Sequence, residues 1–262
     1  MPEGHTIHRL ARDVLTDLGG GPVAASSPQG RFRQGAALLD GATLVTTEAW
    51  GKHLFLRFDV PDVLHIHLGL IGKLVRRPSP PPPPVGQVRL RLEGHAATWD
   101  LSGPMICAVI PPDAVELVTS ELGPDPLRRD ADPERFVERV LSSRKPIANL
   151  LLEQDVIAGI GNVYRAEVLW ALGIHPGREG RSLSRDDVLA IWRWMRDALR
   201  LGVKRNRIVT VDPKEMGVPV SRIPREEALQ AYHRESCRRC GGPIRPLALG
   251  GRRIDACPTC QT

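Results

Sequence analysis

The chain has 262 residues, 25% of them charged and 42% hydrophobic, with 36 Lys and Arg against 30 Asp and Glu. Normal apolar content with mixed charges disfavours a disordered chain, and no stretch approaches the roughly 18 consecutive apolar residues of a membrane span. The first twenty residues carry several charged and histidine side chains, so they are not the apolar core of a secretion signal, and a cytoplasmic location is expected. The net charge of +6 permits a nucleic-acid partner without requiring one.

The N-terminal part of the chain predicts one helix followed by a β-rich domain. Apolar residues at helical spacing predict a helix over 3–18. Alternating runs typical of half-buried antiparallel strands follow at 53–58, 64–68 and 88–92. Strands at this spacing indicate a β-sandwich, and the proline-rich segment 78–84 is expected to be a surface loop between strands. Cys107 stands alone in an apolar stretch and is expected to lie in the core.

Helical spacing replaces the alternation after Gly123-Pro124. Helices are predicted around 136–141, from Pro146 at a first helical position, over about 163–172, and from a Ser184/Asp187 capping box to Gly202. The aromatic and sulfur side chains of the last helix, Trp192, Trp194 and Met195, are interpreted as core packing rather than as a base-stacking platform.

Four of the five cysteines lie in residues 231–262, a segment that also carries +4 of the net +6 charge. Their order is Cys237-x2-Cys240, sixteen residues, then Cys257-x2-Cys260. This spacing suits tetrahedral zinc ligation in a small finger, with Gly-Gly pairs at its turns. The zinc would be structural, because four thiolates leave no open position for water. Two disulfides are the alternative interpretation, disfavoured without a secretion signal.

The start of the chain, Met1-Pro2-Glu3-Gly4, offers a specific chemistry. A small second residue normally allows removal of the initiator Met, which leaves Pro2 with a free secondary amine. An α-amine titrates near neutrality, and a secondary amine that attacks a sugar C1′ forms an iminium directly. Glu3, in the first turn of the predicted helix, could transfer protons in that step.

A second informative run extends from Gln154 to Glu167. Within it, Gly159-Ile-Gly161 predicts a tight turn that opens a helix with Asn162 at its N-terminus. Backbone N–H groups and the helix dipole make such a turn a candidate phosphate site. The pattern alone is not specific, because glycines often precede helices.

Together these elements resemble the formamidopyrimidine-DNA glycosylase/endonuclease VIII family, in the same order and over essentially the whole chain. The matching segments are the MPEG start, Gly51-Lys52-His53, His67-Leu-Gly-Leu-Ile-Gly72, the run 154–167, and a four-cysteine finger ending in Cys-Pro-Thr-Cys-Gln261. Within the family, the chain is most similar to the actinobacterial type of endonuclease VIII.

The resemblance implies catalytic roles for four residues. Pro2 would be the Schiff-base nucleophile, and Glu3 the general acid/base carboxylate. Lys52 would contact phosphate and assist β-elimination. The alternative for Lys52 is a solvated surface lysine without a role in catalysis. Arg252, five residues before Cys257, would grip phosphate and assist δ-elimination.

The resemblance also implies DNA contacts. Asn162 and Tyr232 would bind phosphate, and His67 would contact the DNA. Leu70, helped by Ile71, would fill the gap left when the damaged nucleotide leaves the stack. The alternative for Leu70 is an ordinary hydrophobic turn residue.

The implied fold is an α+β multidomain protein. Its expected parts are an N-terminal catalytic antiparallel β-sandwich with a leading helix (1–118), an interdomain linker (119–131), a helix–two-turn–helix DNA-binding domain (132–228) and a C-terminal zinc-finger β-hairpin (229–262). A monomer is expected, with damaged double-stranded DNA as its partner, one structural zinc, no nucleotide cofactor and no membrane.

The implied function is a bifunctional DNA glycosylase/AP lyase of base excision repair, which removes oxidised bases and cleaves the strand by β,δ-elimination. Pyrimidines are favoured, because Asp100-Leu-Ser-Gly-Pro104 stands where formamidopyrimidine-type enzymes carry Arg-x-Phe. Two other departures are His5-Thr6 in place of Pro-Glu, and Gly69 where a glutamine can occur. The alternatives are a formamidopyrimidine/8-oxoguanine-type purine glycosylase and a non-catalytic zinc-containing protein that binds damaged DNA.

Overall fold

The computed structural model describes residues 2–262, so the predicted removal of Met1 lies outside the described residues. The chain divides into two compact units, with the division between Glu121 and Leu122. Residues 119 and 120 of the predicted linker end a helix of the first unit, and its residues 122–131 are part of the second. No helix within 2–262 is long and apolar enough to cross a membrane.

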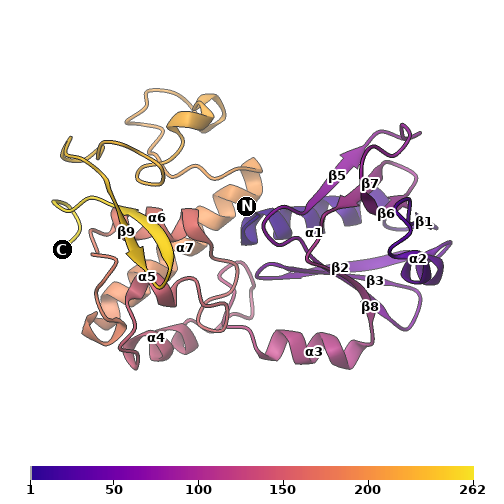
Figure 1. Ribbon diagram of the computed structural model, residues 1–262, viewed down its shortest axis with the longest axis horizontal. Coiled ribbons are helices and arrows are strands. Elements are labelled where there is room, and N and C mark those ends of the chain that lie inside the picture. Colours follow the sequence, from indigo (N-terminus) through magenta and orange to yellow (C-terminus); the bar gives the residue numbers. More distant parts are fainter. Residues whose placement is uncertain (1) are drawn as a thin grey trace. The chain divides into compact units, whose positions relative to one another are not determined.

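The first unit is an antiparallel β-sandwich with a leading helix, as predicted (Figure 1). One sheet has the order β2-β3-β4-β8, with bounds Leu44–Trp50, His53–Phe58, Val63–His67 and Ile106–Ile110. The other has the order β1-β6-β7-β5, with bounds Ala24–Ser26, Val88–Glu93, Thr98–Ser102 and Lys73–Arg77. The three strands predicted from alternation are therefore confirmed as β3, β4 and β6.

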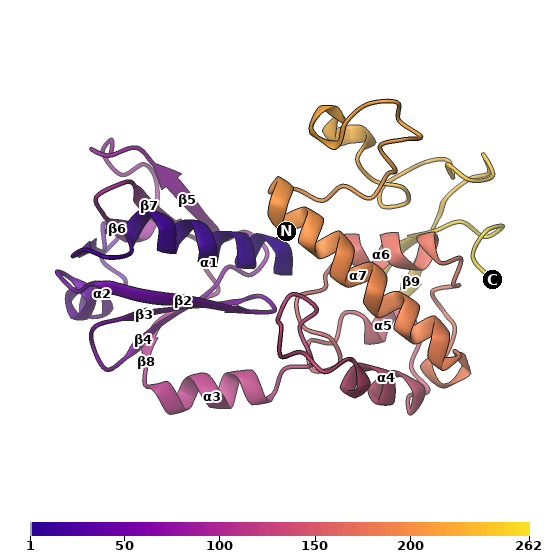
Figure 2. The same ribbon diagram turned by 180° about the vertical axis from the view of Figure 1, so that it is seen from behind.

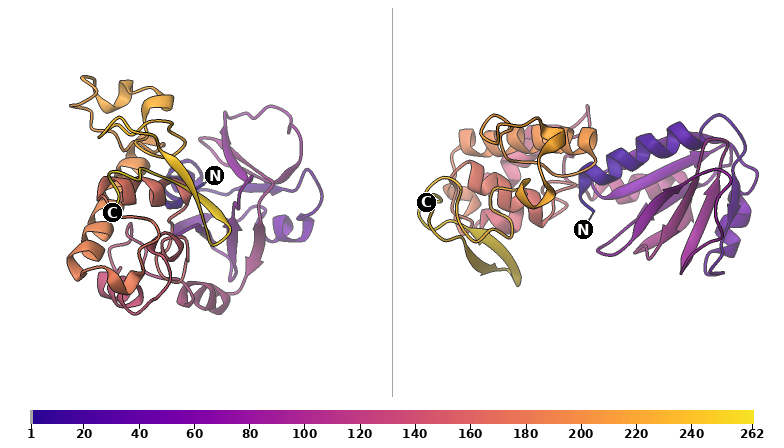
Figure 3. Two further views of the ribbon diagram at one scale, coloured as in Figure 1. Left: turned by 60° about the vertical axis from the view of Figure 1, so that its left-hand side comes forward. Right: turned by 90° about the horizontal axis from the view of Figure 1, so that it is seen from above.

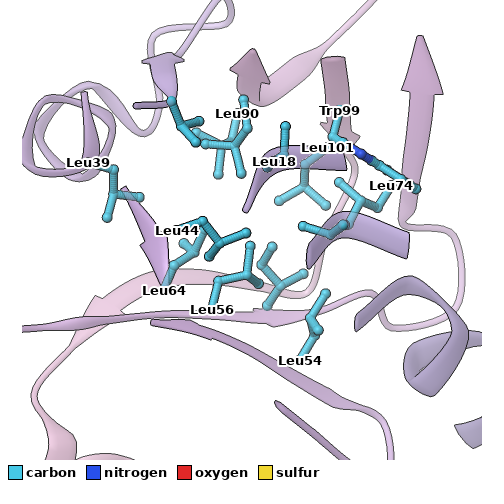
Figure 4. Packing of buried hydrophobic residues seen from close by; sticks show 14 of the residues in the cluster. Leu18, Leu39, Leu44, Leu54, Leu56, Leu64, Leu74, Leu90, Trp99 and Leu101 are labelled. Carbon is cyan, nitrogen blue, oxygen red and sulfur yellow. The ribbon is translucent and has the colours of Figure 1, made fainter. Parts of the chain in front are cut away.

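The core of the first unit lies between these two sheets (Figure 4). Leu54 and Leu56 of β3 face Leu90 and Leu101 of the opposite sheet, and all four side chains are buried. Alternation along β3, β6 and β7 places these leucines on the inner face, whereas Phe55 on the outer face of β3 packs with Val63 and Val115.

Helix α1 (Gly4–Leu18) packs its apolar stripe against this core and runs antiparallel to β2 (Figure 2). Its C-terminal neighbour Gly19 bridges Leu44 at the start of β2, and the Thr47 hydroxyl in mid-strand donates to the carbonyl of Ala11 at 2.7 Å. The N-terminus of α1 therefore lies at the end of the sandwich where β2 ends.

Two shorter helices, α2 (Arg33–Leu39) and α3 (Pro112–Ser120), complete the first unit. The predicted proline-rich loop 78–84 connects β5 to β6. Cys107 is half-buried on β8 and packs against the core, and burial raises the pKa of its thiol to about 12. This thiol is therefore unreactive at neutral pH.

The second unit combines a helical bundle with a β-hairpin (Figure 3). Its helices are α4 (Pro133–Leu141), α5 (Ile147–Leu150), α6 (Asn162–Ala171) and α7 (Arg185–Arg205), with single 3₁₀ turns at Gly180–Ser182, Val220–Arg222 and Arg225–Glu227. Trp192 and Met195 are buried in the bundle and Trp194 is partly buried, which confirms their interpretation as core packing.

Two predicted helix boundaries are wrong. The α7 capping box of Ser184 and Asp187 is present, but the helix continues through Gly202 to Arg205. It ends where Asn206 adopts the left-handed conformation (φ +53°), a role that asparagine shares with glycine. Pro146 is the N-cap of α5 rather than its first helical residue, because its ψ of 138° is extended.

The hairpin consists of β9 (Arg245–Leu249) and β10 (Arg252–Ala256). Their two-residue turn has both glycines at positive φ, +59° at Gly250 and +72° at Gly251, as a type I′ turn requires. Ile254 is buried in the core of the helical bundle, and Leu247 and Leu249 pack against that core. The hairpin is thus anchored by apolar contacts as well as by its cysteines.

Candidate active site

Five of the predicted site residues belong to one end of the β-sandwich: Pro2, Glu3, Lys52, His67 and Leu70. Lys52 lies in the two-residue turn after β2, with Gly51 at φ +58°, and the following residue of β3 pairs with His67. Leu70 is in the loop that follows β4, and Pro2 and Glu3 precede α1, whose N-terminus lies at this end. The fold therefore gathers residues that are up to 68 positions apart in the sequence.

Glu3 is the N-cap of α1 and is fully buried, whereas Pro2 before it is half-exposed. The Glu3 backbone is extended, and its carbonyl oxygen accepts a hydrogen bond from the Thr6 N–H at 2.9 Å. The positive end of the α1 dipole favours a negative charge at this position. After the predicted removal of Met1, a buried carboxylate at this position could exchange protons with a group bound to the Pro2 amine.

Three histidines form a row of rings on β3 and β4. His53 Nδ1 and His65 Nε2 are 2.9 Å apart, and His53 also lies edge-on to His67 with ring centroids 4.8 Å apart. Phe55 stacks on His65 at 4.7 Å. Burial, with the nearby charges of the other histidines and Lys52, lowers the pKa of His53 to about 3, and burial lowers that of His65 to about 4. Both rings are therefore neutral at physiological pH.

His67 is held in one tautomer. Its Nδ1 accepts a hydrogen bond from the Gly69 backbone N–H at 3.1 Å, so its proton resides on Nε2. Burial and the Lys52 ammonium lower the pKa of His67 as well. His67 can therefore act as a neutral hydrogen-bond donor beside a lysine charge, a combination suited to a phosphate group.

In the second unit, Asn162 is the first residue of α6, as predicted. The preceding turn has Gly159 at φ +91°, where a side chain would be strained. Gln154 fixes this turn, because its amide nitrogen donates to the carbonyls of Leu152 and Ile160 at 3.0 Å and its oxygen accepts from Gly159 at 3.0 Å. A rigid turn at a helix N-terminus is suited to an anion.

Arg165 connects this helix start to the hairpin. It is fully buried, and its guanidinium donates to the carbonyl of Ala148 at 3.1 Å, to Oδ1 of Asn162 at 3.1 Å and to the carbonyl of Arg253 at 2.8 Å. One side chain thus joins Asn162 to the start of β10, where Arg252 lies. The hydrogen bond from Arg165 turns the side-chain amide of Asn162 so that its oxygen faces the buried guanidinium.

Arg252 is exposed at the first position of β10. It borders a groove of about 370 Å³ that Lys145, Asn149 and Gly250 also line. A Cβ at Gly250 would lie only 2.8 Å from the Asn149 amide, so the hairpin turn needs glycine there. The exposed Arg252 thus borders the same groove as the closely packed turn at Gly250.

Tyr232 is half-buried, and the segment that carries it is held by Glu167. The Glu167 carboxylate is fully buried and accepts hydrogen bonds from the backbone N–H groups of Gln230, Ala231 and Tyr232, each at 2.8 Å, and from the Thr210 hydroxyl. A buried charge is tolerated when several donors surround it.

The four finger cysteines have the geometry of a metal site. All are free thiols, and their sulfur atoms lie within 4.8 Å of one another. The pairs Cys237–Cys260 and Cys240–Cys257 are 3.9 and 3.5 Å apart, close to the ~3.8 Å edge of a tetrahedron with 2.3 Å metal–sulfur bonds. The cysteines are therefore clustered to hold a metal ion, and the disulfide alternative is wrong.

Donors around Cys237 prepare it as a ligand. Burial alone would raise its pKa, but hydrogen bonds from the backbone N–H groups of Cys240 and Arg239 and from Trp170 lower the pKa to about 6. The Trp170 Nε1–H donates to the sulfur at 3.2 Å, and the Arg239 guanidinium stacks over the Trp170 ring at 4.6 Å. Thiolate, the form that binds metal, is thereby favoured.

Comparisons with known proteins agree with this geometry. Residues 1–101 match the formamidopyrimidine-DNA glycosylase N-terminal domain, and residues 122–213 match the formamidopyrimidine-DNA glycosylase H2TH domain. Endonuclease 8 1 of Mycobacterium tuberculosis is 44% identical over 269 aligned positions, which cover 100% of both chains. The chain belongs to the formamidopyrimidine-DNA glycosylase/endonuclease 8 family.

Other relatives lie in the same family of DNA glycosylases. The formamidopyrimidine-DNA glycosylase of Nocardioides sp. is 32% identical over 86% of this chain and 79% of its own length. The structure of Lactococcus lactis Fpg in complex with an N7-benzyl-Fapy-dG containing DNA is 26% identical, with a TM-score of 0.82 over 99% of both chains. The predicted family and fold class are thus confirmed.

Sequence reasoning missed four residues that organise the site: His53, His65, Arg165 and Glu167. Two of them, His65 and Arg165, had a signal in the spacing. His65 and His67 are two apart on a strand, so they share one face, and Arg165 is three residues after Asn162 on the same face of a helix. Their partners, however, lie up to 88 residues away, and no local pattern identifies those.

Proposed function

We propose that this DNA glycosylase excises oxidised bases through a Schiff base on the Pro2 amine and then cleaves the strand by β,δ-elimination. The observation that carries the proposal is the buried Glu3 carboxylate at the start of α1, directly after a half-exposed Pro2. Lys52 and His67 at the same end of the sandwich support it, because they add a cation and a neutral donor for phosphate.

The reaction begins when the Pro2 nitrogen attacks C1′ of the damaged nucleotide. The bond from C1′ to the base breaks, and the base leaves with the electron pair and takes up a proton. Protonation of the sugar ring oxygen opens the ring and leaves an iminium between Pro2 and C1′. Glu3 carries protons in these steps.

The iminium then acts as an electron sink for strand cleavage. Loss of the C2′ proton expels the 3′ phosphate, and loss of the C4′ proton expels the 5′ phosphate. Water finally hydrolyses the iminium, which releases the sugar fragment and restores the Pro2 amine. Lys52 assists the first elimination and Arg252 the second, each by neutralising a departing phosphate.

DNA binding rests on the phosphate contacts of both units. In this proposal Asn162, Arg252 and Tyr232 bind phosphate, and residues 231–262 contribute +4 of the net charge. Leu70 fills the gap in the stack. The metal held by the four cysteines is one zinc ion, and its role is to fix the finger that presents Arg252.

The preferred substrates in this proposal are oxidised pyrimidines. The Arg-x-Phe of formamidopyrimidine-type enzymes is replaced at 100–104, and this replacement supports the preference. Single-turnover excision from matched duplexes that carry thymine glycol, 5-hydroxyuracil, formamidopyrimidine or 8-oxoguanine tests it. Faster excision of the two purine lesions would favour the alternative, a purine glycosylase.

Borohydride trapping tests the nucleophile. Protein with a free Pro2 amine and a C-terminal tag should form a covalent complex with an abasic duplex, and peptide mapping should place the adduct on Pro2. The matched control carries the same tag before Pro2, which blocks the amine and should abolish trapping. An adduct on Lys52, or undiminished trapping by the blocked protein, contradicts the proposal, and no trapping at all favours the non-catalytic alternative.

A further inference from the structure

The row of rings on β3 and β4 runs along the outer face of its sheet. Residues 53 and 55 of β3 and residues 65 and 67 of β4 alternate onto this face. The register places Phe55 opposite His65. The next rung on this face pairs His53 with His67. Phe55 is fully buried and packs against α3, so the row begins under that helix and ends at the rung next to Lys52.

His65 is the unusual member of this row, because its polar ring is only 3% exposed. The ring stacks on Phe55, and its rung partner on β8 is Ala108. In such surroundings a leucine or phenylalanine would bury more apolar surface, whereas a histidine needs a hydrogen-bond partner. His65 has this partner in His53, because its Nε2 lies 2.9 Å from Nδ1 of His53. The buried histidine thus directs a hydrogen bond toward the catalytic end of the sheet.

This hydrogen bond fixes the ring of His53. Burial is the main reason why the pKa of each ring is lowered, and with both rings neutral one nitrogen donates and the other accepts. The fixed ring also lies edge-on to His67, with ring centroids 4.8 Å apart. His53 is therefore held between a buried anchor on one side and His67 on the other.

His53 also closes the turn that carries Lys52. It pairs with Trp50 across the two-residue turn of Gly51 and Lys52. A ring that is anchored directly after a short turn restricts the backbone of that turn. The anchor at His53 therefore acts on two residues at once, its chain neighbour Lys52 and its cross-strand neighbour on β4.

We propose that His53 and His65 are a positioning pair. Their hydrogen bond holds Lys52 and His67 in the arrangement that binds one phosphate group of the DNA backbone. This inference rests on the proposed function, in which these two residues supply a cation and a neutral donor for phosphate. Two such groups bind one phosphate well only when their separation is fixed in advance. An anchor of two neutral rings fixes it without adding a charge.

Asparagine and glutamine distinguish the two nitrogens of each histidine ring. The asparagine amide lies where Nδ1 lies in histidine, and the glutamine amide lies near the position of Nε2. His53→Asn and His65→Gln therefore keep a polar group at the bonded atoms, whereas the matched controls His53→Gln and His65→Asn move it away. Affinity for a duplex that carries a tetrahydrofuran abasic analogue measures the effect without catalysis. The first two variants should stay within about twofold of wild type, and the two controls should bind about tenfold more weakly.

A double-mutant cycle shows whether the pair acts through Lys52 and His67. In a background that carries Lys52→Met and His67→Gln, each control variant should change the affinity by less than about twofold. Equal affinity of all four variants in the wild-type background, weakened or not, overturns the inference. An equal loss in both backgrounds also overturns it, because the loss would then come from a general change in the structure.

Cleavage of a duplex with a natural abasic site separates this inference from the proposed function. The two control variants should cleave about tenfold more slowly than wild type at saturating DNA, because Lys52 is misplaced for the elimination. If wild-type protein neither cleaves nor traps with borohydride, the proposed function is wrong. The affinities for the abasic analogue still decide the inference in that case.

Discussion

The neutral histidines of β3 and β4 make the stability of the first unit depend on pH. His65 is 3% exposed, and burial lowers its pKa to about 4, against an ordinary value of 6.5. Below pH 6.5 the unfolded chain binds a proton at this residue that the folded chain does not. The contribution of the neutral His65 to the free energy of unfolding is therefore fully present above pH 6.5, and it is lost as the pH falls toward 4.

The size of this loss in unfolding free energy follows from the distance, in pH units, between the pH and the pKa of His65 in the unfolded chain. At pH 5 that distance is about 1.5 units, which corresponds to about 2 kcal/mol for one histidine. His65→Phe removes the titrating group but keeps an aromatic ring against Phe55, whose centroid is 4.7 Å from that of His65. The loss of stability between pH 7.5 and pH 5 should therefore be about 2 kcal/mol smaller in the variant than in wild type.

Hydrogen exchange of peptides from β3 and β4, corrected for the intrinsic rate at each pH, measures the opening free energy of the first unit alone. His95→Phe supplies the control for the substitution itself, because His95 is exposed and lies outside the row of histidines on β3 and β4. If wild type and His65→Phe lose the same free energy between pH 7.5 and pH 5, His65 is not kept neutral by the fold and the reasoning fails.

Three further outcomes concern the second unit. Arg165→Met should destabilise it by about 3 kcal/mol or more in urea unfolding, because the buried carbonyl of Ala148 and two partly buried oxygens lose their donor, and unchanged stability would refute the structural role of Arg165. Arg252→Ala should lower the slope of log affinity against log salt by about one unit for every DNA sequence, and a change in lesion preference alone would argue against a phosphate contact. Thiol-specific mercurial treatment should release about one zinc per chain and abolish DNA binding, while exchange protection in β3 and β4 persists.

Much of the fold was predictable because its signals are local. The alternation in 53–58 and 88–92 identified strands of the sandwich, and the spacing of the cysteines identified the finger. The end of α7 was not predictable from Gly202, because a glycine inside a long helix costs only about 1 kcal/mol and the packed face around it compensates. The last residue of a helix is set by such a balance between backbone cost and packing, whereas the first residue is marked by a specific N-cap.

The candidate site was predictable only as far as its motifs are contiguous. Asn162 and Lys52 lie in short recognisable runs. The role of Arg165, by contrast, depends on its hydrogen bond to the carbonyl of Arg253, which is 88 residues away. The pairing of β3 with β4 likewise turns two separate histidine positions into one row of rings. Long-range partners are set by packing, so local patterns cannot specify them.

The buried polar groups around Asn162 and Tyr232 differ from those around Lys52, and the difference fits the proposed tasks of these residues. The second unit keeps Glu167 and Arg165 fully buried, each hydrogen-bonded several times, and side chains held in this way fix the backbone segments that they bind. The first unit instead keeps His53 and His65 uncharged beside Lys52. A neutral row supports the His67 donor without adding a charge that would vary with pH. Lys52 then lies beside a row that carries no charge of its own, so phosphate affinity there should fall as the salt concentration rises.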